Sequence, residues 1–147
     1  MALQALAVLA SGLFAGVALY VALIARASWL RSVRANPEVA LGDFRFVFPR
    51  VIALQGLLLV LGTGCSVAWW LRSGPTAFLV GAALLGSVAP FTALFVTPVY
   101  RRLFDRALGE RPAEAERQLL HWAWLHLARA TLGLGAFGIL VASLVHR

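Results

Sequence analysis

The sequence has no lysine and a single cysteine. It contains 6 acidic residues and 13 basic residues, and the basic residues are all arginines. The lone Cys65 excludes an internal disulfide and leaves any metal site to other ligands. Charged residues make up only 13% of the chain and hydrophobic residues 61%, with a mean hydropathy of +0.85. This composition excludes an ordinary soluble domain and indicates an integral membrane protein.

Four apolar segments are long enough to cross the hydrocarbon core, which takes about 20 helical residues. They cover residues 3–25, 51–71, 76–100 and 119–145. The short "RSGPT" between the second and third segments predicts an antiparallel hairpin. Because 147 residues leave almost no chain for a further domain, we predict one all-α, up-and-down bundle of four transmembrane helices.

The arginines are distributed unevenly between the two sides of this bundle. Ten lie in two connections: Arg26, Arg31, Arg34, Arg45, Arg50, Arg101, Arg102, Arg106, Arg111 and Arg117. The positive-inside rule therefore places both connections in the cytoplasm and both termini outside, in a bacterial-type inner membrane. The net charge of +7 thus reflects topology, and no nucleic-acid partner is expected.

The first basic connection, from Arg26 to Pro49, is predicted to be a long cytoplasmic loop lying along the membrane interface. Aromatic residues alternate with arginines in it, as in "FRFVFPR". Asn36-Pro37 and Gly42-Asp43 are each expected to interrupt helical structure.

A polar stripe is expected on the fourth span. Trp122, His126, Arg129 and Gly133 are four, three and four residues apart, which aligns them on one helix face. Arg129 lies about 10 Å beyond Trp122, too deep for snorkelling to relieve fully. The stripe therefore has to face polar groups.

No acidic residue lies within a predicted span, so Arg129 has no intramembrane carboxylate to pair with. Its partner is then Glu38 or Asp43 from the first connection, a carbonyl freed by Pro90 or Pro98, a lipid phosphate, or an electron-rich substrate. The sequence is consistent with Arg129 acting either as a structural clamp between helices or as part of a functional site.

Other polar residues fall toward the same ends of their spans. Tyr20, Gln55 and Thr92 are expected to line a polar pocket together with the stripe, because unpaired polar groups in hydrocarbon cost several kcal/mol. Gly12 and Gly16 form a GxxxG pattern, which predicts close packing of the first helix.

Several chemistries are excluded by spacing. His121 and His126 are five residues apart, and His146 lies at the opposite membrane face, so no metal site is expected from this chain alone. No phosphate loop or nucleophile elbow is present, and no cofactor is expected.

The sequence resembles the anthrone-oxygenase-like family of small four-helix membrane proteins. "SGLFAGVALYVALI" is similar to that family's first helix, "PFTALFVTPVYRRL" to the end of its third and "WAWLHLARATLGL" to its fourth. The positions that match its pattern are Gln55, Pro98, Arg102, Trp122, His126 and Arg129. The chain departs from the family at Ala25-Arg26-Ala27, where many members carry Glu-His-Pro, and at Tyr100, where they carry asparagine.

This resemblance implies, for some fungal members, cofactor-independent oxidation of an anthrone to an anthraquinone. We therefore expect a flat, hydrophobic phenol or quinone-like substrate, with His126 as the base and Arg129 stabilising the resulting phenolate or enolate. Tyr20, Gln55, Thr92 and Trp122 would shape the pocket. The alternative is a non-catalytic accessory subunit or lipid-binding bundle, which the missing Glu-His pair favours. Membrane lipid, a hydrophobic small molecule, a second copy of the chain and a partner membrane subunit are the expected partners.

Overall fold

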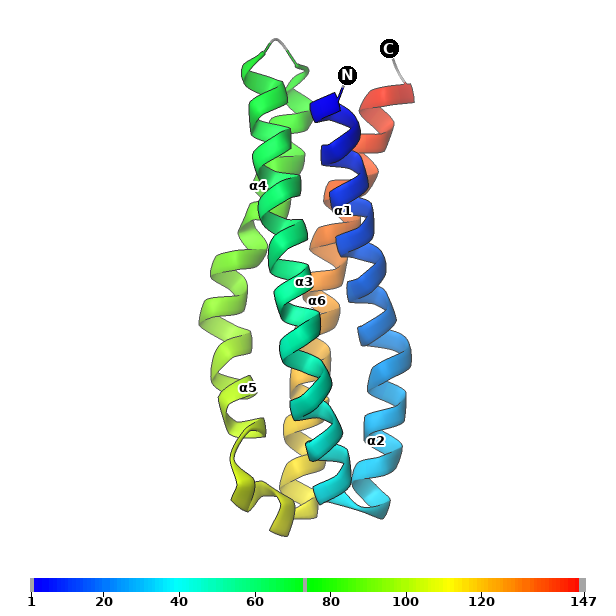
Figure 1. The fold of residues 1–147 in the computed structure, drawn as a ribbon, viewed down its shortest axis with the longest axis vertical. Coiled ribbons are helices and arrows are strands. Elements are labelled where there is room, and N and C mark those ends of the chain that lie inside the picture. The colour runs from blue at the N-terminus through cyan, green and yellow to red at the C-terminus, as the bar shows by residue number, and fades with distance from the viewer. Residues whose placement is uncertain (1, 73, 146–147) are drawn as a thin grey trace.

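The computed structural model describes residues 2–72 and 74–145, and within them all regular secondary structure is helical, with no strand. Four helical columns run up and down beside one another (Figure 1). Their elements, in chain order, are α1 (Ala2–Tyr20), η1 (Val21–Ala25), α2 (Arg26–Ala35), α3 (Pro37–Leu71), α4 (Thr76–Phe91), η2 (Thr92–Val96), α5 (Thr97–Leu103), η3 (Arg106–Glu110) and α6 (Pro112–Val145).

All four columns are long and apolar enough to span a membrane, as the composition predicts. The first, second and fourth contain 34, 35 and 34 residues, and the third contains 28. At a rise of 1.5 Å per residue, each of the three longer columns extends about 50 Å, which exceeds the thickness of a hydrocarbon core of about 30 Å. The columns are therefore longer than the core is thick.

The prediction of a long first loop is wrong, because helices occupy almost all of that segment. α2 continues the first column to Ala35, and α3 begins at Pro37. Only Asn36 leaves helical geometry, with φ −151° and ψ 96°, and its side chain accepts a hydrogen bond from the backbone N–H of Val39. An asparagine N-cap followed by proline is a strong helix start, so the chain reverses there within one residue.

Gly42-Asp43 does not interrupt α3, contrary to expectation. Leu41, Phe44 and Phe48 are fully buried on the face of α3 that meets the other columns. Burial of these large side chains outweighs the cost of about 1 kcal/mol for glycine inside a helix.

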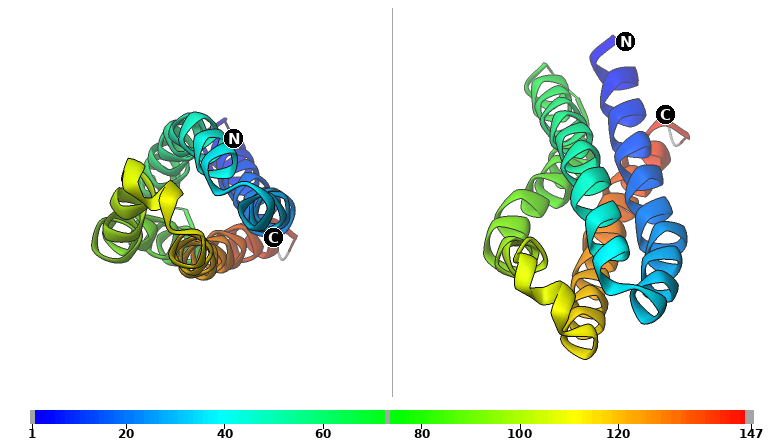
Figure 2. Two further views of the ribbon diagram at one scale, coloured as in Figure 1. Left: turned by 90° about the horizontal axis from the view of Figure 1, so that it is seen from below. Right: turned by 60° about the horizontal axis from the view of Figure 1, so that its bottom comes forward.

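The columns form a ring in the order α1, α3, α4 and α6, so α1 and α4 lie at opposite corners. We call the end that carries the α2–α3 and α5–α6 connections the arginine-rich end. Toward this end α5 packs mainly on α6 and diverges from α3 (Figures 1 and 2). The third column thus separates from the second in its lower half.

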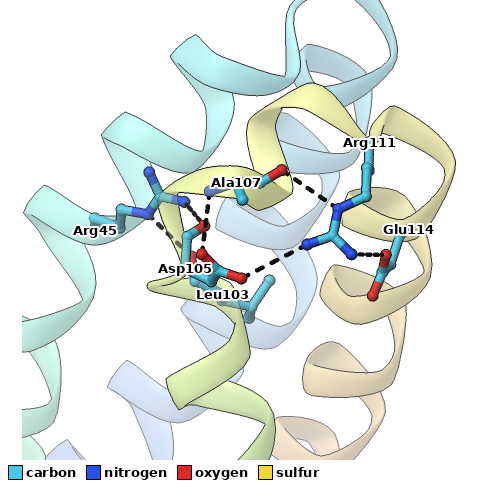
Figure 3. Close-up of polar contacts among 6 residues, drawn as sticks. All are labelled: Arg45, Leu103, Asp105, Ala107, Arg111 and Glu114. Carbon is cyan, nitrogen blue, oxygen red and sulfur yellow. Dashed lines mark hydrogen bonds and ion pairs between the residues drawn. The ribbon is translucent and has the colours of Figure 1, made fainter.

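Backbone carbonyls of the α5–η3 connection are held by an arginine from α3. Arg45 donates from Nε to the carbonyl of Leu103 at 2.9 Å and from Nη2 to that of Asp105 at 2.7 Å (Figure 3). Arg111 donates to Glu114 at 2.7 Å and forms an ion pair with Asp105 at 3.6 Å. The arginine-rich end is therefore closed by contacts between segments about 60 residues apart.

The two glycines of the GxxxG pattern behave differently. A Cβ on Gly12 would lie 2.8 Å from the Phe137 ring, so α1 and α6 approach closely there, as expected. A Cβ on Gly16 would meet nothing within 4 Å, so the predicted close packing does not extend to Gly16.

Candidate functional site

The polar stripe on α6 is buried along its whole length. Trp122, His126 and Arg129 are 1%, 0% and 3% exposed, and Gly133 is also buried. A Cβ on Gly133 would lie 2.8 Å from the Phe14 ring of α1, which shows why this face has no larger side chain there. The stripe therefore points into the ring of columns.

Arg129 is held by a neutral amide. Its Nη2 donates to Oε1 of Gln55 at 3.1 Å, which joins α6 to α3 across the ring. No ion pair to Arg129 is formed among residues 2–72 and 74–145. Of the predicted acidic partners, Asp43 instead accepts a hydrogen bond from Trp29 Nε1 at 2.7 Å. The positive charge of Arg129 is therefore left without a counter-ion from the described chain.

Several buried N–H donors around Arg129 are unused. Nε and Nη1 of Arg129 and Nε2 of Gln55 have no hydrogen-bond partner in the part of the chain that the structure describes. An unsatisfied buried polar group costs about 1–3 kcal/mol, and more when it is charged. A group of buried donors without partners favours the binding of a hydrogen-bond acceptor that comes from outside the chain.

His126 lies one turn away inside an aromatic box. Its ring stacks on Trp122 at a centroid distance of 5.0 Å and faces the edge of Phe48 at 6.4 Å. Trp29 and Phe44 complete the box around Trp122. Both imidazole nitrogens and Trp122 Nε1 lack a partner within residues 2–72 and 74–145. The box thus holds polar atoms that its own side chains do not satisfy.

A cleft of about 230 Å³ opens beside Arg129 between the second and third columns. Its polar lining consists of Gln55, Thr92, Thr97 and Arg129, and the remaining lining is apolar: Ile52, Gly56, Leu59, Ala89 and Ala93. Thr92 lies in the π-helical turn η2, a type of distortion that is frequent at functional sites. The cleft thus joins a buried cation to an apolar mouth.

Three of the predicted pocket residues, Gln55, Thr92 and Arg129, meet in this cleft. Trp122 and His126 lie in the adjoining aromatic box and do not line it. Tyr20 was expected in the pocket, but it is 58% exposed on the outside of the bundle, because its position in the α1 turn faces away from the ring. Pro98 and Arg102 are also exposed and lie outside the cleft.

Sequence reasoning missed the contribution of α3 to the aromatic box. The sequence predicts an interfacial loop for Phe44 and Phe48, yet their rings stack at 5.0 Å and each forms a T-shaped contact with Trp122. Their i, i+4 spacing is the helical signal that could have identified them.

A metal centre is not formed by the described chain. Among residues 2–72 and 74–145, no group of three or more His, Cys, Asp or Glu side chains is placed to hold a metal ion. The expected position of His146 lies outside the described residues.

These features define an all-helical bundle of four membrane-length columns, with a cleft beside a buried arginine that has no ion-pair partner among the described residues. The chain belongs to the anthrone oxygenase family, whose model matches residues 44–139 and hence well over half of the protein. The matched region contains the α3, η2 and α6 residues of the cleft and box but begins after α1. No curated protein and no solved structure matches the chain.

Proposed function

We propose that the protein oxidises a flat, hydrophobic phenol-type substrate, such as an anthrone, at the Arg129 cleft and the adjoining His126 box. The observation that carries this proposal is the group of unused donors on Arg129 and Gln55, within a buried site that has no carboxylate partner among the described residues. Membership of the anthrone oxygenase family supports the type of reaction.

Arg129 acts on the substrate oxygen in this mechanism. Removal of a proton from a methylene that is conjugated to a carbonyl places negative charge on that oxygen. Fixed N–H donors in a water-poor site stabilise such charge far better than water does. Nε and Nη1 of Arg129 and Nε2 of Gln55 supply those donors.

His126 acts as the base, since a proton acceptor needs a nitrogen that no protein donor already occupies. The C–H bond breaks, its proton passes to the imidazole, and the electron pair enters the conjugated ring system. Dioxygen then accepts electrons as a C–O bond forms, and the imidazolium returns its proton to give a hydroperoxide. Loss of the second C–H proton breaks the O–O bond and gives a ketone and one water.

The burial of His126 away from the cleft favours a second candidate function. Its side chain is 0% exposed and does not line the cleft. The positions at which many relatives carry Glu-His hold Ala25 and Arg26, and Arg26 lies over the Trp124 ring at 5.5 Å. A non-catalytic lipid-binding or accessory role therefore remains the alternative proposal. In that case Arg129 binds a lipid without turning it over.

Conversion of an anthrone to an anthraquinone by the purified protein in nanodiscs tests the two proposals. We expect oxygen consumption equal to the quinone formed, and its loss in His126→Phe, which retains an aromatic ring in the box. His121→Phe is the matched control, because His121 is exposed on the same helix. Turnover by His126→Phe at the wild-type rate would remove His126 from the mechanism, and no turnover by the wild type would favour the lipid-binding role.

A further inference from the structure

The cleft beside Arg129 has a mouth that opens to the lipid. Gly56 on α3 and Ala89 and Ala93 on the third column line the cleft and are exposed on the bundle surface. These residues lie within columns that are long and apolar enough to span a membrane. An exposed residue at that depth faces acyl chains, so the cleft is reached sideways from the bilayer.

The unused nitrogen groups at the inner end of this cleft are donors. Arg129 Nε, Arg129 Nη1 and Gln55 Nε2 carry only N–H groups, whereas Gln55 Oε1 already accepts from Arg129. The hydroxyl protons of Thr92 and Thr97 are used on the carbonyls of Val88 and Thr92, at 2.7 and 3.0 Å. A ligand that satisfies the site must therefore present an acceptor, and a positive guanidinium selects an anionic oxygen over a neutral one.

The depth of Arg129 distinguishes between two sources of such an oxygen. Arg129 is near the middle of α6, about 25 Å from either end of that helix, and about three residues from the centre of its apolar stretch. A phospholipid phosphate resides in the headgroup region and would have to sink into hydrocarbon to reach it. A small amphiphile dissolved in the bilayer reaches it without that cost.

The size of the cleft limits how much of the ligand it encloses. At about 230 Å³ it is smaller than pockets that enclose a drug-sized molecule, which occupy roughly 300–1,000 Å³. The cleft accordingly takes the oxygen-bearing end of the ligand, and the rest of the molecule stays between α3 and η2 or in the lipid. Proton transfer to His126, which does not line the cleft, then requires the bound substrate to move further inward toward the aromatic box.

We propose that this cleft is a lateral binding site for a membrane-dissolved aromatic amphiphile, held by one anionic oxygen on Arg129 and Gln55 and entered between α3 and the third column at Gly56. This inference gives the entry route and the binding group for the site of the proposed function, and it rests on that function only for the aromatic nature of the ligand. Binding itself requires no turnover.

Gly56 offers a way to close the cleft without disturbing the core. A Cβ at Gly56 meets nothing within 4 Å, so Gly56→Phe fills the mouth from outside. Gly64 is the matched control, since it is exposed on the same helix, its Cβ also meets nothing within 4 Å, and it lies outside the cleft.

The experiment measures binding of 9-anthracenecarboxylate to the protein in phosphatidylcholine nanodiscs, by fluorescence anisotropy with empty nanodiscs as background. We expect saturable binding that weakens by about tenfold or more in Arg129→Gln, because a charge-assisted hydrogen bond is lost. We expect a loss of similar size in Gly56→Phe, because its ring blocks the mouth of the cleft. Gly64→Phe should bind as the wild type does, and 9-methylanthracene, which lacks the carboxylate, should not displace the probe.

Equal binding by Gly56→Phe and Gly64→Phe would overturn the lateral route, and displacement by 9-methylanthracene would overturn the role of the anionic oxygen. Loss of probe binding in phosphatidylglycerol nanodiscs that persists at high salt, where repulsion of the anionic probe from the lipid surface is screened, would show that a lipid headgroup fills the site, which also contradicts the proposal. Binding with the expected variant pattern but no turnover of an anthrone would leave this inference standing while the proposed function fails.

Discussion

Arg129 and Gln55 are joined across the bundle by one hydrogen bond, 3.1 Å from Nη2 to Oε1, between residues 74 positions apart in the chain. The pair links the centre of α6 to α3, and Arg129 Nε, Arg129 Nη1 and Gln55 Nε2 have no partner within residues 2–72 and 74–145. A neutral partner orients the guanidinium without neutralising it. The cation is consequently positioned and still able to bind an anion.

Gln55→Glu should separate stability from binding. A carboxylate at this position supplies the counter-ion that Arg129 lacks, so we expect a higher unfolding temperature together with weaker binding of 9-anthracenecarboxylate. Gln55→Leu removes the hydrogen bond that the buried Arg129 donates to Gln55 and should lower the free energy of unfolding by about 1–3 kcal/mol. Thermal unfolding in detergent and anisotropy titration measure the two effects, and stronger probe binding by Gln55→Glu would contradict the role given to the unpaired charge.

Gly133→Ala should destabilise the contact between α1 and α6. The added Cβ would lie 2.8 Å from Phe14, which is fully buried and has little room to move. Overpacking of this kind costs about 1–3 kcal/mol. Gly138→Ala is the control on the same helix, because its Cβ meets nothing within 4 Å and alanine is the better helix former. Equal unfolding temperatures for the two variants would refute the close packing at Gly133.

The hydrogen bond from Trp29 Nε1 to Asp43 should couple α2 to α3 energetically. A double-mutant cycle with Trp29→Phe and Asp43→Ala isolates it, and we expect a coupling energy of about 1–2 kcal/mol for a half-buried bond to a charged acceptor. The free energies of unfolding come from denaturant titration in mild detergent. Strict additivity of the two substitutions would show that the bond contributes nothing.

The arrangement of arginines predicts the orientation in the membrane. With Cys65 replaced by serine, Thr76→Cys should react with a membrane-impermeant maleimide added to intact spheroplasts, and Arg106→Cys should react only after lysis. Both residues are exposed. Thr76 begins the third column, and Arg106 lies in the connection that follows the opposite end of that column. The reverse labelling pattern would place the arginine-rich end outside.

The number of spans and their order followed from local patterns, because each apolar run is long enough to cross a membrane by itself and the sequence Gly74-Pro75 separates the second run from the third. The segment from Arg26 to Pro49 did not follow from them. Its prolines, glycine and arginines favour a loop locally, whereas burial of Phe44 and Phe48 against Trp122 keeps it helical.

The candidate site was also predictable only in part. The spacing of Trp122, His126 and Arg129 places them on one face of a helix, and the absence of intramembrane acids leaves the arginine in need of a partner. Tyr20 could not be placed by such reasoning, because a residue's depth along a helix says nothing about the direction in which its side chain points.

The sequence by itself determined the class of protein, the four membrane-length helices and the alignment of the α6 stripe, since hydropathy and the 3.6-residue period act within one helix. Only the tertiary structure decided that Gln55 is the partner of Arg129, that His126 lies in an aromatic box and that a cleft opens at Gly56. Each of these depends on the rotation of one helix against another. That rotation is set by the packing of side chains distant in the sequence, and no local pattern encodes it.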